Sequence, residues 1–424
     1  MKNNSQDDSN FQSRMKSHFT AEKMQHYGRL VMLSVACGLI SGLAAAVFIL
    51  LLQGVTGFYR SHLYLIWTLP FLGFAIGWMY HQFGRDVVQG KTLILEQIHD
   101  PKRIIPPALA PLVLISTLMT HLGGGSAGRE GTAIQIGASL TDQLSQFFKV
   151  TAQERRYLLV AAFGASFGAT IGAPWAGVIF GMEVINVGRI RFNAVAQCLI
   201  ASFVAYFVTK ILGVQHTMFG LVEGAEFSWM TMFWIALAGI AFGLTARLFA
   251  YATHVVEMLH RRWIPYSPLR PFLGGVIIAG FFFLEGSFRY TGLGLVEIQE
   301  AFMKISQIEE PIFKSLFTAV TLGSGFKGGE FMPLVFIGTT LGSALAVLIP
   351  VSFTLLAAVG FAAVFGGAAN TPIACAIMAG ELFGFEVFPY ALIACVISYI
   401  FSGRRGIYKG QMPLSGYKFR GIYR

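Results

Sequence analysis

Charged residues are scarce in this 424-residue chain and make up only 12% of it. A soluble domain carries roughly 25% charged residues, so about half of the usual number is missing. Hydrophobic residues make up 55%, and apolar stretches close to the roughly 20 residues that span a bilayer recur along the chain. These features exclude a large soluble enzyme and a porin-type barrel. They predict an all-α polytopic membrane protein.

Cysteine is also rare, and its placement argues against two kinds of site. The four cysteines are Cys37, Cys198, Cys375 and Cys395. They lie in apolar segments without a CxxC motif, so a disulfide framework and structural zinc are disfavoured. The nine histidines are scattered, with no recurring His/Asp pair, which makes an integral membrane enzyme a remote alternative. We expect no metal and no cofactor.

Acidic residues are outnumbered, with 21 against 31 lysines and arginines and a net charge of +10. Six basic residues and no acid lie between Arg404 and Arg424, and the N-terminal arm is also basic. The positive-inside rule then places both termini in the cytoplasm. Since this rule explains the basic ends, we expect no nucleic-acid partner. Residues 1–28 are polar and lack an apolar core, which predicts no cleavable signal peptide.

Two halves of the chain repeat one pattern about 200 residues apart. The matched positions are Phe167, Gly168, Pro174 and Glu183 in the first half and Phe365, Gly366, Pro372 and Glu381 in the second. If both termini are cytoplasmic and each half crosses the membrane a net odd number of times, the halves are inverted. The predicted divisions are an N-terminal arm 1–28, a first half 29–215, a linker 216–228, an inverted second half 229–410 and a basic cytoplasmic tail 411–424.

Glycine, in contrast, is abundant, and many of the 48 glycines interrupt apolar segments. Broken helices are tolerated in a membrane only where they line a cavity enclosed by protein. In inverted repeats such helices place a site near the bilayer midplane, where half-helix N-termini converge. Because these N-termini carry partial positive charge and free amide donors, they favour an anion. The pattern therefore predicts anion transport.

Two glycine-rich segments with an acid at a helix start occupy matching positions in the two halves. Glu130, within Gly128-Arg129-Glu130-Gly131, either caps its helix and pairs with Arg129 or occupies an anion site and leaves when protonated. We favour the second reading because ionisable groups inside a membrane are usually functional. For Glu330, a salt bridge with Lys327 and a site role are equally open.

Lys91 and Tyr408 complete the candidates. The segment Gly90-Lys91-Thr92 begins another apolar stretch. Together with Gly84 it is close to the sequence of a phosphate-binding loop. The spacing between Gly84 and Gly90 is one residue too long and no strand precedes it, so nucleotide binding is disfavoured. Lys91 is either a solvated interfacial lysine or a cation at the anion site. Tyr408 is either an interface anchor or a hydroxyl donor to the anion.

In this order, the motifs resemble those of the CLC family of anion channels and anion–proton antiporters, over about residues 30–410. The resemblance rests on Gly128-Arg-Glu130-Gly131, Gly328-Gly-Glu330-Phe-Met-Pro333, Ala173-Pro-Trp-Ala-Gly177 with Glu183, and Gly406-Ile-Tyr408. It implies a CLC-type inverted-repeat fold with broken helices, a homodimer in lipid, and one pathway in each subunit. It also implies that Glu130 is the gate and proton carrier.

The predicted site is drawn from these motifs. The anion-binding residues are Gly90, Lys91, Thr92, Gly128, Arg129, Gly131, Phe331, Met332 and Tyr408, and the auxiliary acids are Glu330 and Glu183. Chloride-selective members of the family have Gly-Ser-Gly-Ile-Pro at the position of Gly90–Ile94, and a second proton-carrying glutamate at the position of Val184. These differences, with no regulatory domain expected after the membrane region, are similar to the bacterial fluoride–proton antiporter branch.

Lys91 makes this chain unusual within that branch, whose better-known members have methionine or asparagine there. They also have two phenylalanines at the positions of Ile94 and Gln97, and a threonine at that of Met332. We hypothesise that Lys91 replaces these contacts in retaining a small hydrated anion, or holds ionised Glu130 when no anion is bound. The sequence thus predicts a fluoride–proton antiporter of the inner membrane. An uncoupled anion channel and a chloride-preferring exchanger are the alternatives.

Overall fold

The computed structural model describes residues 4–222, 227–403 and 406–413, and within these ranges it contains sixteen α-helices and one two-stranded sheet. The predicted all-α class is confirmed. Four helical segments are long and apolar enough to cross a membrane: Lys23–Ser61, Leu63–Phe83, Phe192–Ile211 and Trp229–Trp263. Several other apolar helices have only 10–17 residues, as broken spans would.

The elements of the first half are α1 (Asn4–Ser61), η1 (Leu63–Thr68), α2 (Leu69–Phe83), α3 (Lys91–His99), α4 (Leu109–Leu122), α5 (Glu130–Phe147), α6 (Ala152–Ile171), α7 (Pro174–Glu183), β1 (Asn186–Val187), η2 (Phe192–Ala194) and α8 (Val195–Ile211). Those of the second half are α9 (Trp229–Trp263), α10 (Leu269–Glu285), α11 (Leu295–Glu300), α12 (Glu309–Ser324), α13 (Phe331–Leu345), α14 (Phe353–Ala369), α15 (Pro372–Phe383), η3 (Phe385–Val387), α16 (Phe388–Phe401) and β2 (Met412–Pro413). The predicted linker 216–228 lies between α8 and α9, and the predicted tail lies outside the described residues from 414 onward.

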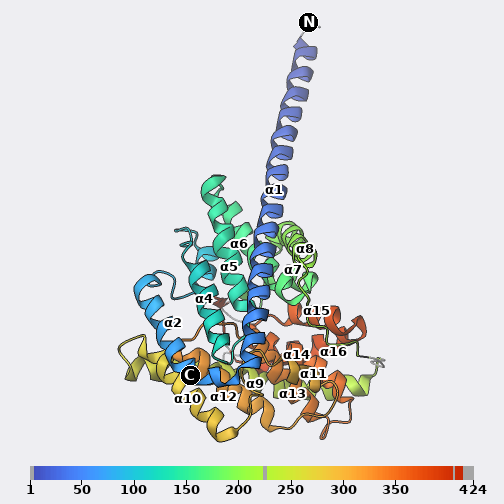
Figure 1. Cartoon of the computed structure of the whole chain (residues 1–424). Coiled ribbons are helices and arrows are strands. Elements are labelled where there is room, and N and C mark those ends of the chain that lie inside the picture. Colours follow the sequence, from blue (N-terminus) through green and yellow to red (C-terminus); the bar gives the residue numbers. More distant parts are fainter. Residues whose placement is uncertain (1–3, 223–226, 404–405, 414–424) are drawn as a thin grey trace.

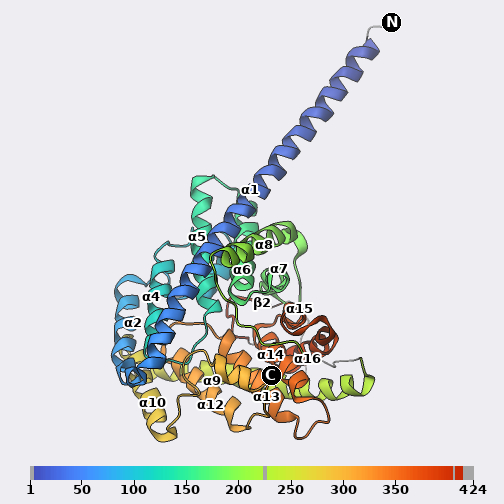
Figure 2. The same ribbon diagram turned by 45° about the vertical axis from the view of Figure 1, so that its right-hand side comes forward.

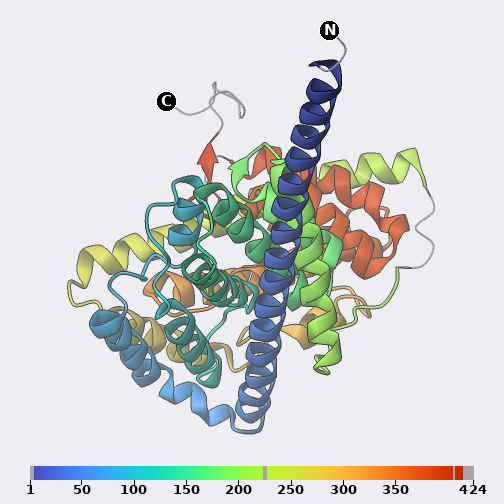
Figure 3. The same ribbon diagram turned by 90° about the horizontal axis from the view of Figure 1, so that it is seen from above.

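Helix α1 crosses the body of the protein and packs against α5, α6 and α8. Its N-terminal part stands clear of the other helices (Figure 1), and from above the helix traverses the molecule (Figure 3). Helices α4–α8 and helices α9–α16 occupy largely different parts of the body in two views (Figures 1 and 2). Most helices of each half therefore form one group in space, whereas α2 of the first half packs against α10 of the second.

Both halves contain a helix that breaks at a proline. Helix α6 ends at Ile171, Gly172 adopts a positive φ of 89°, and Pro174 begins α7. In the second half Asn370, with φ 59°, separates α14 from α15, which begins at Pro372. Proline suits a first helical turn because the missing N–H would have no partner there. The apolar stretch around these residues is therefore two helices, α6 and α7, and not one.

Helices α7 and α15 cap each other with carboxylates. Glu183, the last residue of α7, accepts hydrogen bonds from the amides of Ile373 (3.1 Å) and Ala374 (2.8 Å) at the start of α15. Glu381, near the end of α15, accepts from the amides of Trp175 (3.0 Å) and Ala176 (2.7 Å) at the start of α7. We refer to these as the reciprocal caps. They satisfy amides that a helix start otherwise leaves without partners.

A buried ion pair joins α5 to α6. Arg155 donates from Nε and Nη2 to the two carboxylate oxygens of Asp142, at 2.7 and 2.8 Å. Asp142 also accepts from the amide of Ile105 at 2.7 Å, and its side chain is fully buried. The pair thus fixes the loop before α4 against the helix that begins with Glu130.

Replacing Asp142 by asparagine is expected to lower the free energy of unfolding by about 3–5 kcal/mol, because Arg155 would stay buried without a counter-charge. Denaturant titration in detergent micelles measures the change. Asp100→Asn is the matched control, since Asp100 pairs with Lys102 at 2.6 Å on an exposed surface, where ion pairs contribute little. Equal effects of the two substitutions would contradict a special role for the buried pair.

Candidate functional site

The two matched glycine-rich segments meet through their backbones. Gly128 donates its amide to the carbonyl of Gly329 at 2.6 Å, and Gly329 donates back at 2.7 Å, in an antiparallel bridge. A Cβ atom on Gly329 would lie 2.9 Å from the amide nitrogen of Gly131, closer than real Cβ atoms come. Glycine is therefore required where the halves join, and the bridge places the starts of α5 and α13 side by side.

Glu130 is the first residue of α5, and only 1% of it is exposed. Its carboxylate accepts from the backbone amide of Arg129 at 3.2 Å and from Nε of Arg129 at 3.3 Å. The acid thus lies back over the start of its own helix, next to a buried guanidinium. This is the capping arrangement considered from the sequence, and it places a titratable group beside the junction of the two halves.

Lys91 lies at the junction of three helix starts. It is the first residue of α3 and forms an ion pair with Glu330, the N-cap residue of α13. Its Nζ atom lies 4.9 Å from the centre of the Tyr408 ring. The same atom lies 3.4 Å from the position of a Cβ atom built on Gly131, in the first turn of α5. Half-helix N-termini therefore converge as the repeat predicts, with a lysine among them.

The structure bears on three interpretations that the sequence left open, one for Glu330 and two for Lys91. Glu330 pairs with Lys91 and not with Lys327, whose Nζ lies 4.1 Å from the centre of the Tyr80 ring. Lys91 is not a solvated interfacial lysine, since 13% of its side chain is exposed. Nor does it hold Glu130, whose partner in this structure is Arg129. The carboxylate on the lysine is that of Glu330.

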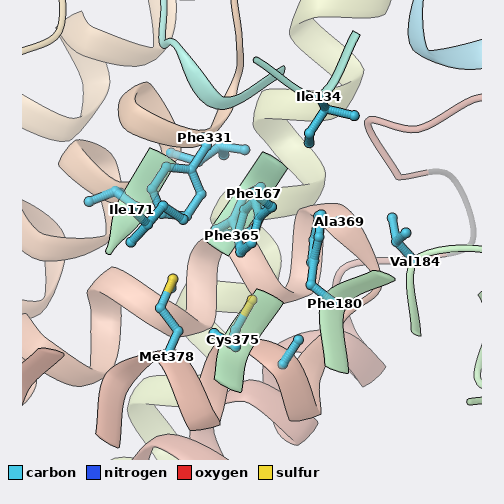
Figure 4. Packing of buried hydrophobic residues seen from close by; sticks show 14 of the residues in the cluster. Ile134, Phe167, Ile171, Phe180, Val184, Phe331, Phe365, Ala369, Cys375 and Met378 are labelled. Carbon is cyan, nitrogen blue, oxygen red and sulfur yellow. The ribbon is translucent and has the colours of Figure 1, made fainter. Parts of the chain in front are cut away.

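A cluster of aromatic rings packs beside the start of α13. Phe331 packs edge to face on Phe167 and Phe365, with ring centres 5.4 and 4.6 Å apart. Phe167 in turn stacks on Phe180 at 3.8 Å (Figure 4). In the sequence, Phe167 and Phe365 served only to mark the repeat. The structure shows that these equivalent residues from the two halves share one aromatic cluster with a predicted site residue.

A small cavity lies next to Glu130. Its volume is about 10 Å³, close to the smallest space that holds one water molecule. The lining residues are Arg129, Glu130, Ile171, Thr217, Phe219, Phe331, Met332 and Phe361. Thr217 and Phe219 belong to the predicted linker, where nothing in the sequence distinguished them. The space is of the size of one water molecule.

The remaining candidates lie in different places. Gly90 is the N-cap of α3 with φ 55°, and Thr92 follows Lys91 in the first turn of that helix. Glu183, at the end of α7, accepts from amides at the start of α15 in a reciprocal cap. We therefore do not place it among the residues around Lys91. Gln97 accepts from the amide of Arg103 at 2.9 Å, away from Lys91. In the described part of the chain, no group of three or more His, Cys, Asp or Glu residues could hold a metal ion.

The arrangement provides a place for one negative charge. A lysine, the positive ends of three helices and a tyrosine ring surround the Glu330 carboxylate, and a second carboxylate, Glu130, lies close by. An anion that replaced the Glu330 carboxylate on Lys91 would meet the same donors and the same partial charges. Binding an inorganic anion and moving a carboxylate are therefore linked at this site.

Comparisons with known proteins agree with these features. A family model described as voltage gated chloride channel matches residues 72–403. A protein of Pseudomonas syringae pv. tomato named "Chloride/fluoride channel protein" is 46% identical over 379 residues, which cover 88% of this chain and 84% of that protein. A Vibrio cholerae serotype O1 protein named "H(+)/Cl(-) exchange transporter ClcA" is 28% identical over 277 residues, 60% of this chain and 58% of its own length.

Solved structures give the same result for the fold. A crystal structure of a CLC-type fluoride/proton antiporter matches with a TM-score of 0.88 and 30% identity, and the match covers 92% of this chain and 98% of that one. The structure of a slow cyanobacterial Cl⁻/H⁺ antiporter matches with a TM-score of 0.76 and 22% identity, covering 88% and 94%. At that identity the second match supports the fold alone.

Proposed function

This chain belongs to the CLC family of voltage-gated chloride channels and antiporters, and from this we propose a function. The protein exports fluoride from the cytoplasm in exchange for protons. Members of this family are transporters or channels and not enzymes. The observation that carries the proposal is the ion pair between Lys91 and Glu330 where the starts of α3, α5 and α13 meet. This site already holds one carboxylate in the position that an anion would take.

Glu130 supplies the second element of the proposed mechanism. When ionised, its carboxylate competes with the anion for the positive region around the start of α5. When protonated, it is neutral and leaves that region to the anion. When the anion replaces the Glu130 carboxylate in this region, Glu130 takes up a proton, and when the carboxylate returns, Glu130 releases it. Anion movement is thereby linked to proton movement. The hydrogen bonds from Arg129 hold the ionised form in place between these changes.

Fluoride is favoured over larger anions by two observations. The cavity beside Glu130 is about 10 Å³. The 46%-identical relative is named for chloride and fluoride, and the structure matched at 30% identity is of a fluoride/proton antiporter. A compact, strongly hydrated anion needs a strong local cation to offset the loss of its water. Lys91 is such a cation, and its charge is compact and not delocalised.

The orientation follows from how charge is distributed between the ends of the helices. Arg29, near the start of the membrane part of α1, donates to the carbonyls of Phe148 and Lys149, so the turn between α5 and α6 lies at that end. Arg155 and Arg156 lie there, at the start of α6. In contrast, Glu285 ends α10, and Glu297, Glu300, Glu309 and Glu310 lie in α11 and α12, at the opposite end. By the positive-inside rule the basic end faces the cytoplasm. We infer an inner-membrane protein with both termini in the cytoplasm and, as the family resemblance implies, a homodimer.

Efflux from liposomes containing the purified protein tests this function. Fluoride and chloride are followed with ion-selective electrodes while the external pH is recorded. We expect faster efflux of fluoride than of chloride, with proton uptake that stops when the fluoride gradient is removed. Fluoride efflux without proton movement would show an uncoupled channel, and faster chloride efflux with proton movement would show a chloride-preferring exchanger. Protein-free liposomes with a proton ionophore are the control.

A further inference from the structure

A second cavity, separate from the Lys91 site, opens at the basic end of the helices. Its volume is about 310 Å³, at the lower limit of the roughly 300–1,000 Å³ typical of small-molecule pockets. The polar part of its lining is Gln153, Arg156, Tyr157, Arg191 and Asn193. The apolar part is Ile98, Ala152, Val160, Ile185 and Ala194. This is far larger than a fluoride site.

The two arginines of this cavity have no carboxylate partner. The neighbouring Arg155 is neutralised by Asp142, whereas Arg156 and Arg191 form no ion pair among the described residues. Arg156 is half-buried and its Nε has no hydrogen-bond partner there, while Arg191 is exposed. Glu154, the nearest acid in the sequence, is directed toward Arg29 at 3.6 Å. The cavity therefore holds two positive charges that no acid in the described part of the chain offsets.

Arg156 is also bonded to the helix that carries Lys91. Its Nη2 donates to the carbonyl of His99 at 3.0 Å, and His99 is the last residue of α3. Ile98, one residue earlier, lines the cavity. Helix α3 is only nine residues long, so Arg156 at one end and Lys91 at the other contact the same short helix. The cavity thus lies at the far end of the helix that presents the proposed anion ligand.

Another lining residue, Ile185, leads toward Tyr408. Ile185 lines the cavity and accepts the amide of Met412 at 3.3 Å, and β1, which follows Ile185, pairs with β2 through Asn186 and Met412. Strand β2 begins four residues after Tyr408. An occupant that contacts Ile185 would therefore act on the segment that holds this tyrosine. Two connections, one through α3 and one through β1 and β2, link the cavity to residues around Lys91.

We propose that this cavity binds a phosphate group at Arg156 and Arg191, and that its occupation tunes transport through α3 and β2. Two guanidinium groups present planar, charge-assisted donors that match phosphate oxygens. Basic pockets at the cytoplasmic side of membrane helices also take up anionic lipid headgroups. A soluble phosphate compound and a lipid headgroup share this chemistry. The effect on transport rests on the proposed function, whereas the binding itself does not.

Binding is measured first and without transport. Inorganic phosphate is titrated into the detergent-purified protein, and the heat of binding is measured by calorimetry. Gluconate salt keeps the ionic strength constant as the phosphate concentration rises. In parallel, the protein is extracted from vesicles of phosphatidylcholine with or without cardiolipin, and the retained lipid is identified by native mass spectrometry. We expect phosphate binding or cardiolipin retention, weakened about tenfold or more in Arg156→Gln/Arg191→Gln, because charge-assisted hydrogen bonds are lost.

The controls separate this site from general surface charge. Arg189→Gln removes an exposed arginine two positions from Arg191 that does not line the cavity, and it is expected to change neither readout. Arg191→Gln alone leaves the bond between Arg156 and His99 intact and is expected to show part of the loss. Phosphate binding would identify a soluble ligand, and cardiolipin retention alone a lipid. If neither is found, or Arg189→Gln weakens binding equally, the proposal is wrong.

Discussion

Glu130→Gln is expected to abolish fluoride-driven proton uptake by liposomes that contain the protein. Glutamine has nearly the same shape as glutamate but cannot exchange a proton at the pH of the assay. The side chain is 1% exposed and bonded to Arg129, so the substitution leaves the packing of the site largely unchanged. A neutral residue also ceases to compete with the anion, and fluoride efflux should continue without proton coupling.

The measurement records fluoride and pH in the same vesicles, so that loss of coupling is distinguished from loss of folding. Glu96→Gln is the matched control, because Glu96 is an exposed acid on α3, five positions from Lys91. This control should retain the coupling of the unaltered protein. Proton uptake that persisted in Glu130→Gln would show that another group carries the proton.

Lys91→Met is expected to reduce fluoride efflux strongly and to destabilise the protein. The side chains of Lys91 and Glu330 are 13% and 18% exposed, so the pair is partly buried. Losing one partner of a fully buried pair costs about 3–5 kcal/mol, which is the upper bound here. The remaining Glu330 carboxylate would also repel the anion. Two opposite charges about 4 Å apart attract by roughly 4 kcal/mol at an effective dielectric near 20, so the lysine is a large part of the attraction that any anion finds here.

A second substitution separates the two roles of Lys91. In Lys91→Met/Glu330→Gln no unpaired charge remains, and the free energy of unfolding should recover toward that of the unaltered protein. Fluoride efflux should stay low, because the cation that retains the anion is still missing. Lys91→Arg keeps the charge and tests whether a compact ammonium is needed. Unchanged rate and selectivity in Lys91→Met would contradict the role proposed for Lys91.

Features encoded by neighbouring residues could be predicted from the sequence. Pro174 and Pro372 mark the second helix of each broken pair because proline suits a helix start. The glycines before Glu130 and Glu330 mark segments where backbones approach closely. The predicted all-α class and the convergence of helix starts therefore agree with the structure.

Pairings between distant residues could not be predicted in the same way. Lys91 and Glu330 are 239 positions apart, and the sequence left a salt bridge of Glu330 with the nearby Lys327 and a site role equally open. Likewise, Glu183 lies in a motif shared with transport proteins, but its partners are amides about 190 positions away. The partner of each of these side chains depends on how the two halves pack against each other. The spacing of residues within one half does not determine that packing.

The reciprocal caps bear on how such a chain could have arisen. Glu183 and Glu381 hold equivalent positions nine residues after equivalent prolines, and each caps the other half. In an antiparallel pair of identical half-length chains, a single glutamate codon would have provided both caps. Duplication and fusion of one ancestral gene would then preserve the interface without any new interaction. The two halves can differ elsewhere, as Arg129 and Gly329 do, while this pair of contacts keeps them together.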